Sequence, residues 1–390
     1  MTLDITQSIE ACAAHYGDDA EAMKAYLIEG QRQALALPNR GPLKFDAGGN
    51  IHSDILSAYS EFGFYILEGV LGEDEIGDIK ADLASMRENF PVHMGADKDA
   101  QGRPALGADC TAMTLQWARP LSDPLGGTQI ANGRHQVKLF EPKAPDDAPP
   151  AVPIYLSGML QFSPACLRVY AHPDLLKLAE AIHGPDFTPF TEGLFIKDAG
   201  LGPAVSWHQD GDTHWDSPDF NEDIHGFNFM GQVFHSTAVN GVWVLPGSHK
   251  TGRADIVKMV ESSGSERIEG AVPIICSPGD VVINNRQNLH GSFANSGFEP
   301  RVTVNFGFHR RSSVLGVKGA GIHAEANVMD ADFIDTRSRL IGLAINARAQ
   351  RFPDETPYDY APFAGRESEF IWSEAAQASL KDYNLMDLSI

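Results

Sequence analysis

Two residue types that bind metal ions lie close together in Trp207-His208-Gln209-Asp210. Successive side chains of a strand point to opposite faces, so His208 and Asp210 project to the same side if this segment is extended. One imidazole and one carboxylate at this spacing can share a metal ion. An isolated pair is weak support, because a hydrogen-bonded pair at the end of a strand explains it as well. A metal centre therefore needs a third ligand.

His290 is the candidate third ligand. It lies in the segment NLHGS (288–292), after the turn and strand SPGDVVINN. Two histidines and one carboxylate form the facial triad of non-haem Fe(II) oxygenases. Three ligands on one face leave three positions open, which suits a bidentate co-substrate and O₂. We therefore predict that His208, Asp210 and His290 bind Fe(II).

Eleven residues after His290, Arg301 begins a strand, RVTVNFGFH, whose two faces differ in polarity. Burying a guanidinium is costly unless an anion meets it. A dicarboxylate co-substrate would supply that anion, and arginine can hold its distal carboxylate through two hydrogen bonds. The alternative is an edge-strand arginine paired with a surface acid. One face carries Arg301, Thr303 and Asn305, and the other carries Val302, Val304, Phe306 and Phe308.

The elements around these residues predict a mainly β protein with flanking helices. From 190 to 309, short β-rich runs alternate with turn signals, as in an antiparallel sandwich or barrel. Residues 95–153 are rich in Gly, Pro and Asp, and we expect a long surface excursion rather than a domain linker. A strand is expected at FGFYILEG, and helices at 5–36, 53–62, 73–88, 173–183, 330–349 and within 353–390.

The amino-acid composition argues against some classes of binding partner. Lys plus Arg is 30 and Asp plus Glu is 52, so the formal charge is −22 and binding to nucleic acid or a membrane surface is not expected. The four cysteines form no CxxC pair, which favours a reduced, cytoplasmic setting without disulfides. No signal peptide and no transmembrane helix is expected.

The segment 53–315 resembles the phytanoyl-CoA dioxygenase family of Fe(II)/2-oxoglutarate oxygenases. EFGFYILEGVLGEDEI is similar to the family's first strand and helix, and HPDLLKLAEAIHG to the helix before its barrel. WHQD matches the metal motif, NGVWVLPGSHK the central strand and turn, and HGS followed by Arg301 the closing motif. The pattern covers about two thirds of the chain. Helical extensions at 1–50 and 316–390 flank it, and we expect one domain over 1–390.

The resemblance implies a double-stranded β-helix (jelly roll, cupin-like) core at about 190–309. It implies that His208, Asp210 and His290 bind iron and that Arg301 anchors 2-oxoglutarate, with Ser292 sharing the same carboxylate. Lys197, on the strand before the metal motif, is a further candidate for the co-substrate. Because the aspartate is present where the family's halogenases have a small residue, the resemblance favours hydroxylation over halogenation.

Other candidates are less specific. Thr303 shares the face of Arg301, and Gln232 lies on the strand 227–237, where it contacts co-substrate or is simply a satisfied core amide. His214 and Trp215 lie where a lid loop would start, or on an ordinary surface loop. His249, in PGSHK, is expected to pin a turn rather than to bind iron.

The sequence thus predicts a dioxygenase that uses Fe(II), 2-oxoglutarate and O₂ to hydroxylate an unactivated C–H bond, with release of succinate and CO₂. The substrate would be a small metabolite or natural product, because no basic run suits a CoA ester. A homodimer is plausible from the extra helical ends. Two alternatives stay open: a zinc-type hydrolase, and a metal-binding β-helix protein without catalysis.

Overall fold

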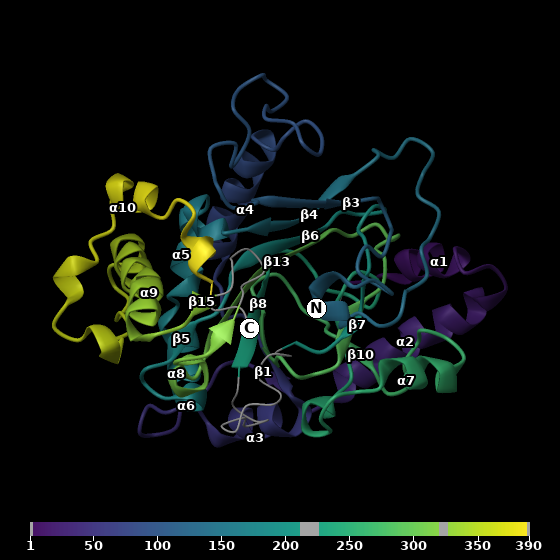
Figure 1. Ribbon diagram of the computed structural model, residues 1–390. Helices are drawn as coiled ribbons and strands as arrows, with labels where there is room; N and C mark the ends of the chain where they lie inside the picture. The colour runs from purple at the N-terminus through teal and green to yellow at the C-terminus, as the bar shows by residue number, and fades with distance from the viewer. Residues whose placement is uncertain (1–2, 211–225, 320–326, 388–390) are drawn as a thin grey trace.

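The computed structural model describes residues 3–210, 226–319 and 327–387 (Figure 1). Most of its strands belong to two sheets, and β14 and β15 pair with each other apart from them. The strands are β1 Arg40–Gly41, β2 Phe64–Leu67, β3 Leu115–Ala118, β4 Val152–Ser157, β5 Thr188–Pro189, β6 Gly193–Lys197, β7 Val205–His208, β8 Gly226–Gln232, β9 Trp243–Val244, β10 Val272–Pro273, β11 Val281–Asn285, β12 His290–Ser292, β13 Arg301–His309, β14 Lys318–Gly319 and β15 Asn327–Val328.

The strand order defines the architecture. The larger sheet runs β1-β2-β11-β8-β13-β6-β4-β3, with β5 paired to β13, and the smaller sheet runs β10-β9-β12-β7. Met230 and Val282 of the larger sheet join Trp207 and Trp243 of the smaller sheet in one buried apolar cluster. The two sheets therefore pack face to face. This arrangement confirms the predicted jelly-roll core, mainly β with flanking helices.

Helices flank the two sheets, and local capping chemistry sets several of their ends. The predictions at 53–62, 73–88 and 173–183 are confirmed. Pro173 occupies the first turn of its helix and Gly184 follows the last residue. The helices are α1 Thr6–Ala14, α2 Ala20–Ala36, α3 Ser53–Phe62, α4 Glu73–Glu88, α5 Pro164–Tyr170, α6 Pro173–His183, α7 Ile256–Ser263, α8 Arg311–Val314, α9 Ala331–Arg351 and α10 Glu374–Ser379.

One helix prediction is wrong, and the helices α5, α7 and α8 were not predicted. The segment 5–36 forms two helices, α1 and α2, separated by a 3₁₀ turn at Gly17–Asp19. Gly17 has a φ of 57°, a left-handed conformation that glycine adopts readily and that interrupts the helix. Helix α5 is apolar apart from Arg168, and so short and apolar a helix has no clear amphipathic period to detect.

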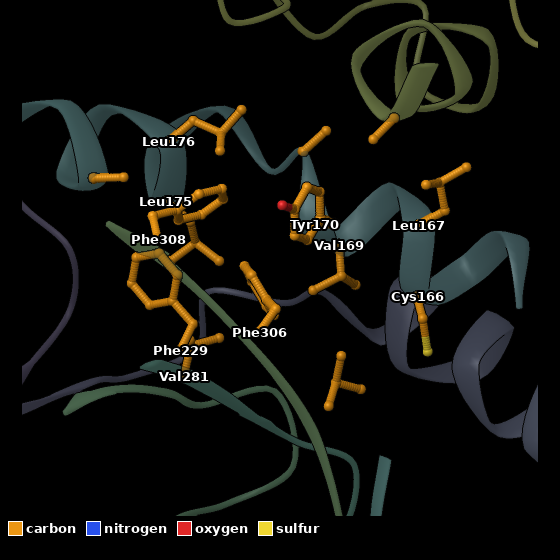
Figure 2. Packing of buried hydrophobic residues seen from close by; sticks show 14 of the residues in the cluster. Cys166, Leu167, Val169, Tyr170, Leu175, Leu176, Phe229, Val281, Phe306 and Phe308 are labelled. Atoms are coloured by element: carbon orange, nitrogen blue, oxygen red, sulfur yellow. The ribbon is translucent and has the colours of Figure 1, made fainter. Parts of the chain in front are cut away.

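Strand β13 separates two environments. It pairs with β8 on one side and with β6 on the other. Phe306 and Phe308 point to the large core under α5 and α6, where Figure 2 shows them near Phe229, Val169 and Tyr170. Arg301 and Thr303 alternate with these apolar residues and face the smaller sheet. The predicted alternation of polar and apolar faces is confirmed.

The two extensions lie on opposite sides of the sheets in Figure 1, with α1 and α2 in purple and α9 and α10 in yellow. Helix α2 contacts the smaller sheet, where the Tyr26 ring stacks on Trp243 with centroids 4.5 Å apart. Helix α9 packs along α5. Among the described residues, none of the helices combines the length and the apolar composition that a membrane span requires. One domain over the whole chain stays a prediction.

A buried ion cluster ties the end of the C-terminal extension to the strand region. Arg337 of α9 donates through Nη2 to Glu192 at 2.6 Å and to Asp387 at 3.1 Å. The Thr191 hydroxyl donates to the other Asp387 oxygen at 2.6 Å. One arginine thus meets two fully buried carboxyl groups. Burial raises the pKa of Asp387 to about 7, and the neighbouring Glu192 also raises it while Arg337 lowers it.

This cluster predicts a stability that falls as pH rises. A pKa of about 7 in the folded protein lies above the ordinary aspartate value of 3.8. The folded state therefore holds a proton that the unfolded state releases, and the group's stabilisation declines between about pH 4 and pH 7. Asp387→Asn is expected to flatten this decline, because the amide does not titrate; the decline is on the order of 1 kcal/mol per pH unit.

The check is the free energy of unfolding in urea at pH 5, 6, 7 and 8 for wild type, Asp387→Asn and the exposed control Asp332→Asn. The difference between Asp387→Asn and wild type should grow in favour of the variant as pH rises. Parallel pH profiles for these two proteins would contradict the prediction.

Candidate metal centre

The smaller sheet brings the three predicted ligands together. His208 ends β7, His290 begins β12, and the two are direct antiparallel partners. Their rings lie 4.2 Å apart between centroids. Nε2 of His208 is 3.6 Å from Asp210 Oδ1, and Nε2 of His290 is 3.8 Å from Asp210 Oδ2. One ligand atom from each residue lies within 4.8 Å of the others, so a single ion can contact all three.

Backbone carbonyls fix the tautomer of both imidazoles. Nδ1 of His208 is 2.9 Å from the carbonyl oxygen of Ser206, and Nδ1 of His290 is 2.8 Å from that of Asn288. A carbonyl oxygen only accepts, so Nδ1 carries the hydrogen in each ring. Nε2 is left with its lone pair toward Asp210, which is the arrangement of metal-binding histidines.

The charge state of the cluster suits a divalent cation. Burial lowers the pKa of His208 well below its usual value, and His290 and His135 lower it further. Burial by itself raises the pKa of Asp210, but Arg134 and the two imidazoles outweigh it and hold that pKa below its ordinary value. Neutral imidazoles with one carboxylate form the donor set that non-haem Fe(II) prefers.

The turn before His290 is held against α3 by a close approach that requires glycine. Gly63, which ends α3, has a φ of 76°. A Cβ there would lie 2.4 Å from the Asn288 side chain and 2.5 Å from Nδ1 of His249. Nε2 of His249 lies 3.1 Å from the Ser60 carbonyl oxygen. The structure thus places His249 in the 3₁₀ turn Ser248–Lys250, next to the turn before His290 and outside the metal cluster. His214 and Trp215 lie outside the described residues.

A second cluster, of positive charge, lies on the larger sheet. Arg301 of β13 and Lys197 of β6 are direct register partners and both are buried. Lys197 Nζ donates to the Ser292 hydroxyl at 3.0 Å and to the Phe293 carbonyl. Nε of Arg301 is buried without a hydrogen-bond partner. No carboxylate of the described residues forms an ion pair with either side chain.

Burial disfavours the charged form of both side chains. Burial lowers the pKa of Lys197 well below its usual value, and the adjacent Arg301 lowers it further. Burial also lowers the pKa of Arg301, to about 10. Two like charges held side by side in a buried position cost several kcal/mol unless an anion compensates them.

The other predicted co-substrate residues are bonded to each other. The Thr303 hydroxyl donates to Gln232 Oε1 at 3.1 Å, and Gln232 Nε2 donates to the Met230 carbonyl at 3.1 Å. Both side chains lie on the Arg301 face of the sheet. The Gln232 side chain is thus a hydrogen-bonded core amide, as the alternative interpretation stated. Its contact with a co-substrate stays a prediction.

Sequence reasoning missed two residues that touch the metal cluster. Arg134 lies 3.0 Å from Asp210, and the His135 ring lies 4.3 Å from the His208 ring. His135 is 1% exposed, so the expectation that 95–153 is only a surface excursion is wrong. The Gly- and Pro-rich composition of this segment has no regular pattern from which the contact could be predicted. The adjacent Arg134 and His135 were the sequence signal that could have indicated it. The same segment also supplies β3 to the larger sheet.

The jelly roll and the buried His-Asp-His cluster together define the class of non-haem iron oxygenases. A sequence model described as "Phytanoyl-CoA dioxygenase (PhyH)" matches residues 59–303, more than half of the chain. The chain therefore belongs to the phytanoyl-CoA dioxygenase family and is a 2-oxoglutarate-dependent oxygenase with iron as its metal. The resemblance read from the sequence is confirmed.

Solved structures similar to the chain include EctD from S. alaskensis with 2-oxoglutarate and 5-hydroxyectoine. It is 20% identical, with 70% of this chain and 81% of that chain covered and a TM-score of 0.47. The 2-oxoglutarate-dependent epimerase SnoN from nogalamycin biosynthesis is 14% identical, with coverage of 66% and 82% and a TM-score of 0.42. No curated protein matches the chain significantly by sequence. The assignment to the family rests on the family match.

Proposed function

We propose that this oxygenase uses Fe(II), 2-oxoglutarate and O₂ to hydroxylate an unactivated C–H bond of a small metabolite or natural product. Succinate and CO₂ would be the co-products. The observation that carries the proposal is the pairing of two features: an open His-Asp-His cluster, and a buried pair of cations without an anion among the described residues. A dicarboxylate that chelates the metal through one end and meets the cations through the other satisfies both.

In this proposal each residue near the metal has a defined task. His208, Asp210 and His290 hold the ion through Nε2, one carboxylate oxygen and Nε2. When bound, iron together with 2-oxoglutarate and O₂ supplies the oxidation that places oxygen on carbon. Because the carbonyls of Ser206 and Asn288 fix both rings, the ligands need no rearrangement when the ion enters. The two neighbouring strands give the site its rigidity.

Arg301 is proposed to hold the distal carboxylate of 2-oxoglutarate through two hydrogen bonds. Its planar guanidinium group matches the geometry of a carboxylate, and its Nε–H has no hydrogen-bond partner and is available to donate. Lys197 and Ser292, already bonded to each other, present a second positive charge and a hydroxyl beside it. Burial strengthens these contacts because no water competes for the same groups. Thr303 and Gln232 would line the wall next to this carboxylate.

The alternatives have less support. A zinc-type hydrolase needs the metal cluster and one bound water, but it has no use for two buried cations on the opposite sheet. A metal-binding protein without catalysis leaves those cations unexplained as well. A small-molecule substrate fits the family, and a cytoplasmic location and a homodimer stay predictions.

The test begins with metal-free protein loaded with Fe(II) under anaerobic conditions and titrated with 2-oxoglutarate. We expect binding that requires the metal and that weakens strongly for 2-oxobutyrate, which lacks the distal carboxylate. Air and a panel of candidate substrates should then yield succinate with at least one of them. Activity restored by zinc in the absence of 2-oxoglutarate would favour the hydrolase. Absence of both 2-oxoglutarate binding and succinate would end the proposal.

A further inference from the structure

The segment between β3 and β4 reaches the metal cluster through Arg134 and His135. Before them, Ala131, Asn132 and Gly133 all adopt left-handed backbone conformations, with φ of 52°, 59° and 68°. This conformation costs non-glycine residues about 1–2 kcal/mol each. A backbone held in this way at two such residues indicates that the surrounding contacts determine where the next side chains point.

Those contacts anchor the segment on both sides of the dipeptide. The Gly127 N–H donates to the His135 carbonyl at 2.8 Å. The buried Asp123 carboxylate accepts from the N–H groups of Gly126 at 3.0 Å and Leu139 at 2.8 Å. Arg134 and His135 therefore sit between two fixed points of the loop.

His135 packs directly on one predicted metal ligand. Its ring is tilted 35° to the His208 ring at a centroid distance of 4.3 Å. Its Nδ1 lies 3.2 Å from the Ser206 carbonyl oxygen, the same oxygen that receives the hydrogen of His208 Nδ1. One carbonyl thus orients both rings, and the loop is locked against the metal cluster at this point.

Arg134 contacts the cluster's carboxylate. Its Nη1 lies 3.0 Å from Asp210 Oδ1, and the two side chains are 27% and 13% exposed. The Asp210 N–H also donates to the Arg286 carbonyl at 2.8 Å, so both the backbone and the side chain of this ligand are held. Asp210 lies just beyond the end of β7, where the sheet no longer fixes it.

We propose that Arg134 is a positioning residue that orients the Asp210 carboxylate for the metal. The inference rests on the proposed role of Asp210 as a ligand. A guanidinium at this place has two opposing effects on metal binding: its charge repels the incoming cation, whereas its hydrogen bond holds the carboxylate in one orientation. The outer partners of metal ligands typically contribute about 10- to 100-fold in affinity. If Arg134 acts mainly by orienting the carboxylate, its removal weakens metal binding. If it acts mainly through its charge, its removal strengthens metal binding.

The experiment compares wild type with Arg134→Gln, Arg134→Lys, Arg134→Ala and the loop control Arg119→Gln. Arg119 pairs with Glu141 and its side chain is 56% exposed. Affinity for Co(II) is measured by anaerobic titration, and the visible absorption of bound Co(II) reports the ligand geometry. We expect affinity to fall by about 10- to 100-fold in Arg134→Gln and Arg134→Ala, with an altered Co(II) spectrum.

Arg134→Lys keeps the charge without the planar fork, so we expect its affinity to lie between those of wild type and Arg134→Gln. Arg119→Gln should match wild type. Added guanidinium should restore part of the affinity of Arg134→Ala, a result that a loss of folding would not produce. Thermal unfolding of the metal-free variants checks that each is folded.

Tighter Co(II) binding by Arg134→Gln, or equal affinity with an unchanged spectrum, would overturn the inference and leave Arg134 as a nearby charge. The wild type separates this failure from that of the proposed function. If wild type binds Co(II) but not 2-oxoglutarate, the proposed function fails while the role of Arg134 can still stand. If wild type binds no metal, both fail.

Discussion

Asp210→Ala should bind Fe(II) or Co(II) more than about 100-fold more weakly than wild type, beyond the range typical of an outer partner of a ligand. The change removes the single carboxylate of the cluster and leaves the two imidazoles. It also leaves Arg134 facing the metal position without the charge that it contacts at 3.0 Å. The measurement is the dissociation constant of Co(II) by anaerobic titration, together with succinate formation by the Fe(II)-loaded protein.

Two companion variants sharpen this test. Asp210→Asn keeps the shape of the side chain and loses the charge, so it should fail nearly as badly. Asp146→Ala removes an exposed carboxylate from the segment between β3 and β4 and should bind metal as wild type does. Retention of wild-type affinity by Asp210→Ala would show that the ion binds elsewhere, and the proposed centre would have to be abandoned.

Arg301→Ala should spare metal binding and damage the binding of 2-oxoglutarate. Truncating one partner of a buried charge pair typically costs about 2–5 kcal/mol, which is roughly 30-fold or more in affinity. We expect the lower part of this range, because Lys197 lies beside Arg301 and keeps one positive charge for the carboxylate. Removal of Arg301 also relieves the repulsion that lowers the pKa of Lys197.

The most direct readout is selectivity between two co-substrates. Wild type should prefer 2-oxoglutarate to 2-oxobutyrate strongly, and Arg301→Ala should lose most of this preference while its Co(II) affinity stays unchanged. Arg301→Lys should recover part of it, because a point charge cannot make the bidentate contact. Arg339→Ala, a partly exposed arginine of α9, is the control. An unaltered preference in Arg301→Ala would place the distal carboxylate elsewhere.

Much of the fold follows from patterns that are local in the sequence. The polar and apolar alternation from Arg301 to His309 marks a strand between a core and a lumen, because a strand has a period of two. Pro173 and Gly184 mark the two ends of a helix for equally local reasons. The break at Gly17 was harder to place, because a single glycine within a helical pattern only lowers the preference for helix.

The same distinction between local and long-range features applies to the candidate site. The predicted ligand types and the spacing of His208 and Asp210 follow directly from the order of the residues, as does an arginine at a separation from His290 typical of one family. The side chains that surround these residues could be identified only from the folded chain. Arg134 reaches Asp210 from a loop without regular periodicity, and Lys197 meets Arg301 through strand register. Contacts of this kind depend on backbone positions set by the whole fold, and residues far apart in the chain leave no local signal of their meeting.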